Sequence, residues 1–177
     1  LDDDPGVLIS ACLFGDAAGA LVLSRESDSK RCIHWKAHES LLDPKTRDSL
    51  RFDQRNGMLR NILTPQVPAL AASHAKTVFD RVLHQTNLNR RDIAAWILHA
   101  GGRDVLLALR ETLALAESDV AWSADALREL GNVSSPFVIH VLARALAGGV
   151  PDGYWYMSSF GAGFSCHGAL LEVTSRP

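Results

Sequence analysis

The stretch Trp96-Ile-Leu-His-Ala-Gly-Gly102 constrains the fold of this chain more than any other. Residues 93–98 form a short apolar run, which predicts one buried strand with His99 at its carboxyl end. In α/β sheets, ligands bind at that end of the strands. The two glycines permit a sharp turn and a close approach of a substrate. His99 is therefore a candidate for chemistry, and a satisfied core histidine is the equal alternative.

A second polar stretch, Gly131-Asn-Val-Ser-Ser135, lies before an expected helix. The amide of Asn132 offers uncharged N–H donors, as a site for a developing oxyanion requires. The start of the helix adds a partial positive potential. The plainer interpretation is a turn or N-cap asparagine.

The remaining sequence predicts helices and strands in alternation. Apolar residues at helical spacing predict an amphipathic helix over residues 66–85. Further helices are expected over 103–114, over 124–130 with Ser123 as N-cap, and from Pro136 to Gly148 with Ser134 or Ser135 as N-cap. Strands are expected over 20–24, 32–38, 58–63, 93–98, 154–157 and 168–173, with a turn over 158–165, and residues 43–57 are expected to be a loop that could hold one helical turn. This order indicates an α/β fold with a mixed β-sheet.

Size and charge exclude several classes of protein. A length of 177 residues suits one domain with a full core. A net charge of -2 provides no attraction to nucleic acid or to an anionic membrane. No apolar run approaches the roughly 18 residues of a membrane span. The first residue is Leu1 rather than a methionine, so we expect a piece of a longer protein.

A nucleophile is missing from these candidates. The chain has no Gly-x-Ser-x-Gly motif. Cys12 lies in an apolar run and is expected to be buried and inert, while Cys32 and Cys166 belong to strands. The three cysteines have no paired spacing, which disfavours a disulfide framework or a zinc site and fits a reducing compartment. The histidines likewise share no spacing that suggests a metal.

Four motifs occur in an order that resembles a known family. They are Phe14-Gly-Asp-Ala-Ala-Gly-Ala-Leu-Val22, His99-Ala-Gly-Gly102, Gly131-Asn-Val-Ser-Ser135 and Phe160-Gly-Ala-Gly-Phe164. Together they resemble the C-terminal half of type III polyketide synthases, the chalcone/stilbene synthase family. The resemblance covers nearly the whole chain.

The resemblance implies a thiolase-like fold, with residues 1–177 forming one C-terminal-type domain that has a mixed β-sheet and helices packed on its faces. Such enzymes have two similar halves and usually form homodimers. Their catalytic cysteine lies in the N-terminal half, which is absent here and would be a partner of this chain. Their catalytic histidine and asparagine correspond to His99 and Asn132.

The resemblance also implies an activity. The full-length protein would be a cytoplasmic acyltransferase that condenses malonyl-CoA, with loss of CO2, onto an acyl group transferred from acyl-CoA to the cysteine. Coenzyme A thioesters would be substrates, with no permanently bound cofactor or metal, and this chain alone would be inactive. Gly101, Gly102 and Ser134 would flank the coenzyme A tunnel, and the substrate pocket would be lined by Phe160, Gly161 and Gly163.

Some residues depart from the plant-type pattern. Ala100 and Ala162 replace prolines, and Pro136 replaces a small residue. Residues 43–61 match poorly, and they fall where members of the family line the pocket. The starter, the number of extensions and the mode of cyclisation therefore stay open. One alternative is a condensing enzyme like β-ketoacyl-ACP synthase III, although its histidine is typically followed by Gln-Ala-Asn. Another is a non-catalytic thiolase-like domain that only dimerises or binds a partner.

Overall fold

The computed structural model describes residues 4–25 and 29–176, and a four-stranded sheet forms its centre. The strand order is β1 (Arg31–Leu42), β6 (Ser165–Ser175), β5 (Gly153–Gly161) and β4 (Ile93–Leu98). β4 runs parallel to β5, whereas β5 with β6 and β6 with β1 are antiparallel. The predicted mixed sheet is thus confirmed, with β5 and β6 as its closing hairpin.

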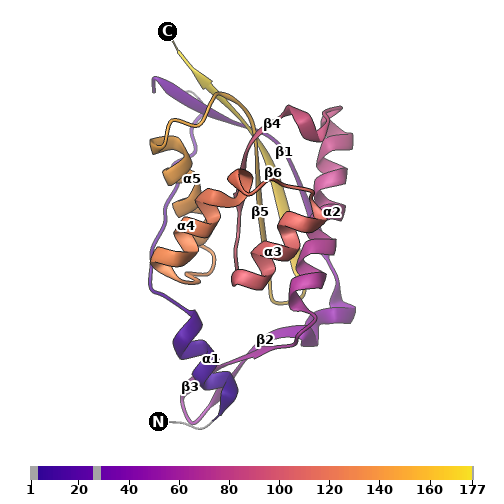
Figure 1. Cartoon of the computed structure of the whole chain (residues 1–177), viewed down its shortest axis with the longest axis vertical. Helices are drawn as coiled ribbons and strands as arrows, with labels where there is room; N and C mark the ends of the chain where they lie inside the picture. Colours follow the sequence, from indigo (N-terminus) through magenta and orange to yellow (C-terminus); the bar gives the residue numbers. More distant parts are fainter. Residues whose placement is uncertain (1–3, 26–28, 177) are drawn as a thin grey trace.

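Helices cover both faces of this sheet (Figure 1). α2 (Val67–Thr86) packs on β1 and β6, and α3 (Arg103–Thr112) packs against α2. On the opposite side lie α4 (Ala121–Leu130) and α5 (Phe137–Ala147). The buried face of α2 contains several alanines, which permit a close approach to the strands. The largest fully buried side chains are Trp155, Tyr156, Phe137 and Phe164.

A smaller layer closes the end of the sheet at which β4 stops. It consists of α1 (Pro5–Leu13) and a hairpin of β2 (Leu50–Arg55) with β3 (Met58–Leu63), drawn below the sheet in Figure 1. The carboxylate of Asp4 caps α1 by accepting a hydrogen bond from the Gly6 N–H at 2.8 Å. Three short 3-10 helices complete the described elements: η1 (Pro44–Ser49), η2 (Arg90–Asp92) and η3 (Ser118–Val120). Within the described parts, no helix combines the length and apolar character needed to cross a membrane.

The strand predicted over residues 20–24 is wrong. This segment is irregular, with Val22 95% and Leu23 82% exposed, and no strand of residues 4–25 or 29–176 pairs with it. An apolar run forms a strand only when a neighbour accepts its backbone hydrogen bonds. These side chains therefore form an uncovered apolar segment.

The loop predicted over residues 43–57 contains one helical turn, η1, but also the whole of β2. The charged residues of β2 remove the apolar pattern by which a strand is recognised in a sequence. A strand in an exposed two-stranded ribbon can form without that pattern, because it needs no continuous apolar face. The turn predicted over 158–165 is shorter, since β5 extends to Gly161 and β6 begins at Ser165.

The predicted serine N-caps are also wrong. Ser123 lies inside α4, and its Oγ accepts a hydrogen bond from the Leu98 N–H at 3.2 Å. This contact ties the helix to β4. The N-cap of α5 is Pro136, with no side-chain cap hydrogen bond. Ser134 instead has a φ of 57°, which places it in the turn before that helix.

Candidate active site

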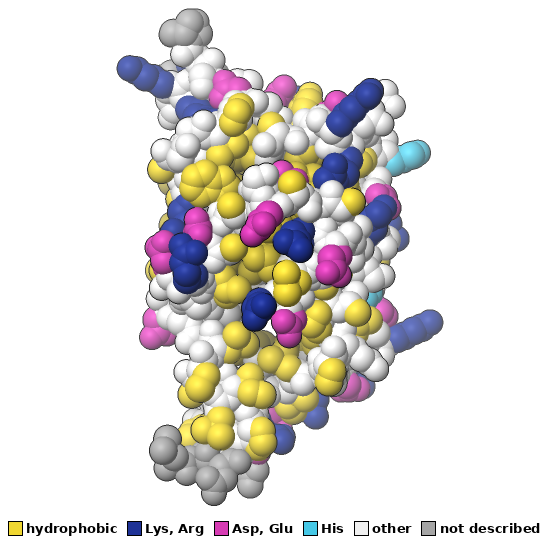
Figure 2. Space-filling model, viewed as in Figure 1, with side chains coloured by type: hydrophobic (Ala, Val, Ile, Leu, Met, Phe, Trp, Pro, Cys, Tyr) yellow, Lys and Arg dark blue, Asp and Glu magenta, His cyan; other side chains and the backbone are white. Residues whose placement is uncertain are grey.

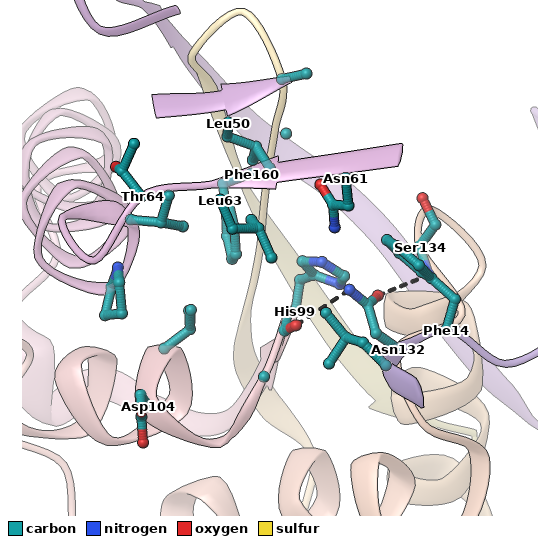
Figure 3. A pocket seen from close by; sticks show the side chains of 18 of the residues that line it. Phe14, Leu50, Asn61, Leu63, Thr64, His99, Asp104, Asn132, Ser134 and Phe160 are labelled. Carbon is teal, nitrogen blue, oxygen red and sulfur yellow. Dashed lines mark hydrogen bonds between the residues drawn. The ribbon is translucent and has the colours of Figure 1, made fainter. Parts of the chain in front are cut away.

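A pocket of about 590 Å³ lies between the carboxyl end of β4 and the β2–β3 hairpin. Figure 3 shows side chains from both halves of this arrangement pointing into the same space. The chain segments that line the pocket are far apart in sequence: the end of α1, the hairpin, the start of α2, the His99 loop, the Asn132 turn and the end of β5. The structure therefore brings His99 and Asn132 together, as the two sequence motifs suggested.

His99 is held by its backbone and surrounded by aromatic rings. Its N–H donates to the Ser158 carbonyl of β5 at 2.8 Å, which continues the β4–β5 pairing. The imidazole lies edge-on to the Phe137 ring, at 5.3 Å between centroids, and 5.0 Å from the Phe160 ring. Burial lowers the pKa of His99 to about 4. The ring is thus neutral at neutral pH and can donate one N–H hydrogen bond.

Asn132 has a fixed amide orientation. Its Oδ1 accepts the Ser134 N–H at 2.9 Å, and its Nδ2 donates to the Gly101 carbonyl at 3.1 Å. A backbone N–H can only donate, so the identities of the two amide atoms follow from these contacts. Nδ2 carries a second hydrogen that these contacts leave available to a ligand.

The backbone of Asn132 is anchored to the end of α1. Its N–H donates to the Leu13 carbonyl at 3.0 Å, and its own carbonyl accepts the Gly15 N–H at 3.1 Å. Gly131 has a φ of +69°, and a Cβ there would lie 3.2 Å from the Leu13 carbonyl oxygen. Glycine is therefore required for this turn. The start of the motif Phe14–Val22 therefore holds the Asn132 turn in place through backbone hydrogen bonds.

The two glycines after His99 have different surroundings. A Cβ on Gly101 would lie 2.7 Å from Cζ of Phe160, whereas one on Gly102 would meet its nearest atom at 4.0 Å. Only Gly101 is needed for close packing against the aromatic ring. Gly101, Gly102 and Ser134, which we expected to bind coenzyme A, all line the pocket.

The glycine-rich motif at the β5–β6 turn lies partly in the pocket. Phe160 and Gly161 line it, together with Ala162, but Gly163 does not. Gly163 has a φ of +135°, so its place in the turn accounts for glycine at that position.

An aromatic stack connects this turn to α2. Phe160 stacks on Phe164 at 6.0 Å, and Phe164 stacks on His74 at 5.4 Å. His74 Nε2 lies 3.3 Å from an Asp43 carboxylate oxygen, and Asp43 also pairs with the backbone of Phe164. The aromatic stack that begins at Phe160 in the pocket is therefore fixed at its other end by His74 and Asp43.

None of the three cysteines lines this pocket. Cys12, predicted to be buried, is exposed, because α1 covers the hairpin with one face only and its other face is open. Cys166 is buried, and burial raises the pKa of its thiol to about 11. Cys32 is also buried. In the described ranges, no cluster of three His, Cys, Asp or Glu side chains could hold a metal ion.

The resemblance placed residues 43–61 at the pocket only as a segment, and no single residue of it was named from the sequence. Leu50 and Asn61 of this segment line the pocket, and so does Thr64 beyond it. A signal for Asn61 was available, because it and Leu63 are two residues apart and therefore share one face of β3. The single amide in the run Asn61-Ile-Leu63 lies on the same side as an apolar residue that faces the pocket.

Three comparisons relate the chain to known proteins. Residues 83–173 match the family model described as 3-oxoacyl-[acyl-carrier-protein (ACP)] synthase III C terminal. A curated relative, 3,5-dihydroxyphenylacetyl-CoA synthase of Streptomyces toyocaensis, is 33% identical over 90% of this chain and 43% of its own length. The chain spans about half the length of the curated relatives it matches.

Two solved structures share the fold. The polyketide synthase PKS-I of the brown alga Ectocarpus siliculosus is 28% identical, with a TM-score of 0.74 over 84% of this chain and 42% of its own. The fungal type III polyketide synthase ORAS is 24% identical, with a TM-score of 0.69 over 81% of this chain and 41% of its own. These neighbours agree with the thiolase-like α/β fold that the motifs implied.

Proposed function

This chain belongs to the family of 3-oxoacyl-ACP synthase III C-terminal domains, and we propose that it is the C-terminal half of a type III polyketide synthase. In this proposal residues 1–177 form one domain, which supplies the oxyanion-binding part of the active site. The whole protein is an acyltransferase that lengthens an acyl chain with malonyl-CoA. One curated relative is named as the synthase of a coenzyme A thioester, 3,5-dihydroxyphenylacetyl-CoA, and this name supports the proposal.

One observation carries the proposal. His99 and the Asn132 amide face one pocket, and the contacts of Asn132 leave one Nδ2 hydrogen unused. A neutral imidazole beside it adds a second uncharged donor. Two positioned donors in a largely apolar pocket are suited to an oxygen that becomes negative only during the reaction.

The chemistry follows from this arrangement. The thioester oxygen of malonyl-CoA accepts hydrogen bonds from Nδ2 of Asn132 and from the His99 imidazole. The bond between the methylene carbon and the carboxylate breaks, CO2 leaves, and the electron pair moves onto the thioester oxygen as an enolate. The two donors stabilise this charge more strongly than that of the neutral thioester, which lowers the barrier.

Condensation needs a second component. The enolate carbon attacks the acyl carbonyl of a cysteine thioester, a C–C bond forms, and the cysteine thiolate leaves. We propose that this cysteine belongs to the N-terminal half of the protein, since none of Cys12, Cys32 and Cys166 lines the pocket. A thiolate near His99 would favour the imidazolium form and thus oppose the effect of burial on its pKa.

The remaining site residues have supporting roles. Gly101, Gly102 and Ser134 flank the pantetheine arm of coenzyme A, whereas Phe160 and Gly161 border the acyl chain. Gly163 shapes the turn that carries them. The reaction uses coenzyme A thioesters as substrates and requires no resident cofactor in this proposal.

Exposed apolar residues support the proposal that further protein partners pack against this chain. Leu21, Val22 and Leu23 are exposed on the irregular segment, and Ile33 and Trp35 are exposed on β1, an edge strand of the sheet. We propose that the N-terminal half and a second subunit of a homodimer cover these surfaces. The three free cysteines suit a reducing compartment, so we place the protein in the cytoplasm.

A β-ketoacyl-ACP synthase III activity is the second candidate, because the matching family model bears that name. The two candidates differ in the carrier of the extender unit. The test is release of labelled CO2 and formation of extended products by the full-length protein, with malonyl-CoA or malonyl-ACP as substrate. Our proposal predicts turnover with malonyl-CoA alone. Turnover only with malonyl-ACP would support the second candidate, and none with either would support a non-catalytic domain.

A further inference from the structure

His74 is a polar residue on the sheet-facing side of α2 that the proposed reaction does not use. It follows Ala71 by three residues and precedes Val78 by four, so it lies on the apolar stripe that packs on the sheet. Figure 2 shows Lys, Arg, Asp and Glu side chains along the border of the molecule that α2 forms. The His74 side chain, by contrast, is only 13% exposed. A polar side chain among buried apolar residues requires hydrogen-bond partners of its own.

Both ring nitrogens of His74 have a partner. Nδ1 lies 2.7 Å from the Leu70 carbonyl oxygen, and because a carbonyl only accepts, Nδ1 donates this hydrogen bond. Nε2 lies 3.3 Å from a carboxylate oxygen of Asp43. That carboxylate is itself held, since it accepts hydrogen bonds from the Lys45 N–H at 3.1 Å and from Oγ1 of Thr46 at 3.0 Å. The plane of the imidazole is therefore fixed by contacts to two separate segments of the chain.

The fixed imidazole supports the aromatic rings of the pocket. His74 stacks on Phe164, with 5.4 Å between ring centroids and 27° between ring planes, and Phe164 stacks on Phe160 at 6.0 Å and 7°. Phe160 in turn lies 5.0 Å from the ring of His99. Asp43 and Phe164 also exchange two backbone hydrogen bonds, at 2.8 and 3.2 Å, which continue the pairing of β1 with β6. These contacts form a continuous row of rings from α2 to the candidate catalytic histidine.

The middle ring of this row, Phe164, is completely buried and contacts a ring on each side. In a close-packed interior, a side chain moves only when a neighbour makes room for it. Loss of the His74 ring would let Phe164 move toward α2, and Phe160 could then follow it away from the pocket that it lines. The pocket would become deeper beside the acyl chain, so the position of His74 affects the length of chain that fits.

We propose that His74 is a positioning residue that limits the length of the acyl chain, because it holds Phe164 and Phe160 in place. The assignment rests on the proposed function, since it assumes that the growing chain borders Phe160. His74 itself does not line the pocket, so it acts on the chain only through the two phenylalanines.

The test is the distribution of products that the full-length protein forms from malonyl-CoA alone, sorted by mass spectrometry according to the number of condensed units. His74→Ala removes the ring and keeps a strong helix former in α2. We expect the ratio of the next longer product to the main wild-type product to rise by roughly two- to tenfold, the effect of one lost aromatic contact. A variant that only loses stability forms less of every product and keeps this ratio, so the ratio distinguishes the two roles.

The matched control is His84→Ala, the same change at an exposed position of the same helix and outside the pocket lining, which should keep the wild-type ratio. His74→Gln, which has a polar side chain but no ring, should raise the ratio as His74→Ala does, and it replaces that variant if the alanine protein does not fold. Phe164→Leu should raise the ratio as well. His74→Ala added to Phe164→Leu should then change little, because the contact between the two rings is already lost.

Two results would overturn the assignment: folded His74 variants that keep the wild-type ratio, or fully additive effects of His74→Ala and Phe164→Leu. Either result, in a protein that forms products from malonyl-CoA, refutes the role of His74 and leaves the proposed function standing. A wild-type protein that forms no product from malonyl-CoA refutes the proposed function itself.

Discussion

The side-chain Nδ2 of Asn132 donates a hydrogen bond to the backbone carbonyl of Gly101 at 3.1 Å. This contact joins two turns that are 31 residues apart in the chain, one after β4 and one before α5. It holds the Asn132 amide beside the loop that begins at His99, so the two proposed donors depend on each other for position.

Asn132→Asp should abolish this arrangement while it preserves the size of the side chain. The carboxylate has no N–H, and it would place negative charge against the Gly101 carbonyl and against the developing oxyanion. We expect release of CO2 from malonyl-CoA by the full-length protein to fall at least about 100-fold, as when an oxyanion donor is lost. Asn87→Asp, at the exposed end of α2, is the control and should retain wild-type activity.

Gly101→Ala and Gly102→Ala form a matched pair for stability. An added Cβ at position 101 would lie 2.7 Å from Phe160 Cζ, so this variant should lose about 1–3 kcal/mol of unfolding free energy through overpacking. The change at 102 meets no atom closer than 4.0 Å on an extended backbone and should cost much less. Urea denaturation measures both values, and equal losses would contradict the packing of Phe160 on Gly101.

Burial of neutral His99 predicts a dependence of stability on pH. The pKa of His99 falls from 6.5 to about 4 in the folded chain, so between these values the unfolded chain binds more protons. The part of the unfolding free energy that depends on neutral His99 is fully present above pH 6.5 and is lost as the pH falls through 4. The total loss is about 3 kcal/mol.

The measurement for this pH effect is urea denaturation between pH 4 and 7, with His99→Gln as the comparison. The glutamine variant lacks the titrating ring and should lose less stability on acidification. If both proteins lose the same amount over this range, His99 is not buried in its neutral form.

The 177-residue chain alone should not condense malonyl-CoA with an acyl starter, because none of its cysteines lines the pocket that contains His99. The measurement is mass spectrometry of the products after incubation with both thioesters. Robust formation of an extended product by the isolated chain would contradict the division of the active site between two halves.

The sequence predicted the parts of this fold that carry a strong local pattern. The apolar stripe of α2 and the run that forms β4 placed both elements, and the glycines after His99 and before Asn132 marked the two turns that meet. Each of these features is encoded within a few neighbouring residues, so one sequence is enough to find it.

The sequence predictions that were wrong concern residues whose structure depends on partners distant in the chain. Residues 20–24 read as a strand because they are apolar, yet no described strand accepts their hydrogen bonds. Ser123 has the side chain of an N-cap but bonds Leu98 instead. The spacing of Asn61 and Leu63 places them on one face of β3, but that this face borders the pocket follows only from the packing of the hairpin against the His99 loop. No local pattern contains this information, because it arises from packing between segments.

The most direct test of this account is the rate of CO2 release from malonyl-CoA by the full-length protein with His99→Ala, compared with the wild type. His99 is one of the two proposed donors to the thioester oxyanion, so we expect a loss of about 100-fold or more with the fold intact by circular dichroism. A folded His99→Ala protein that releases CO2 at the wild-type rate would contradict the assignment of this pocket as the decarboxylation site.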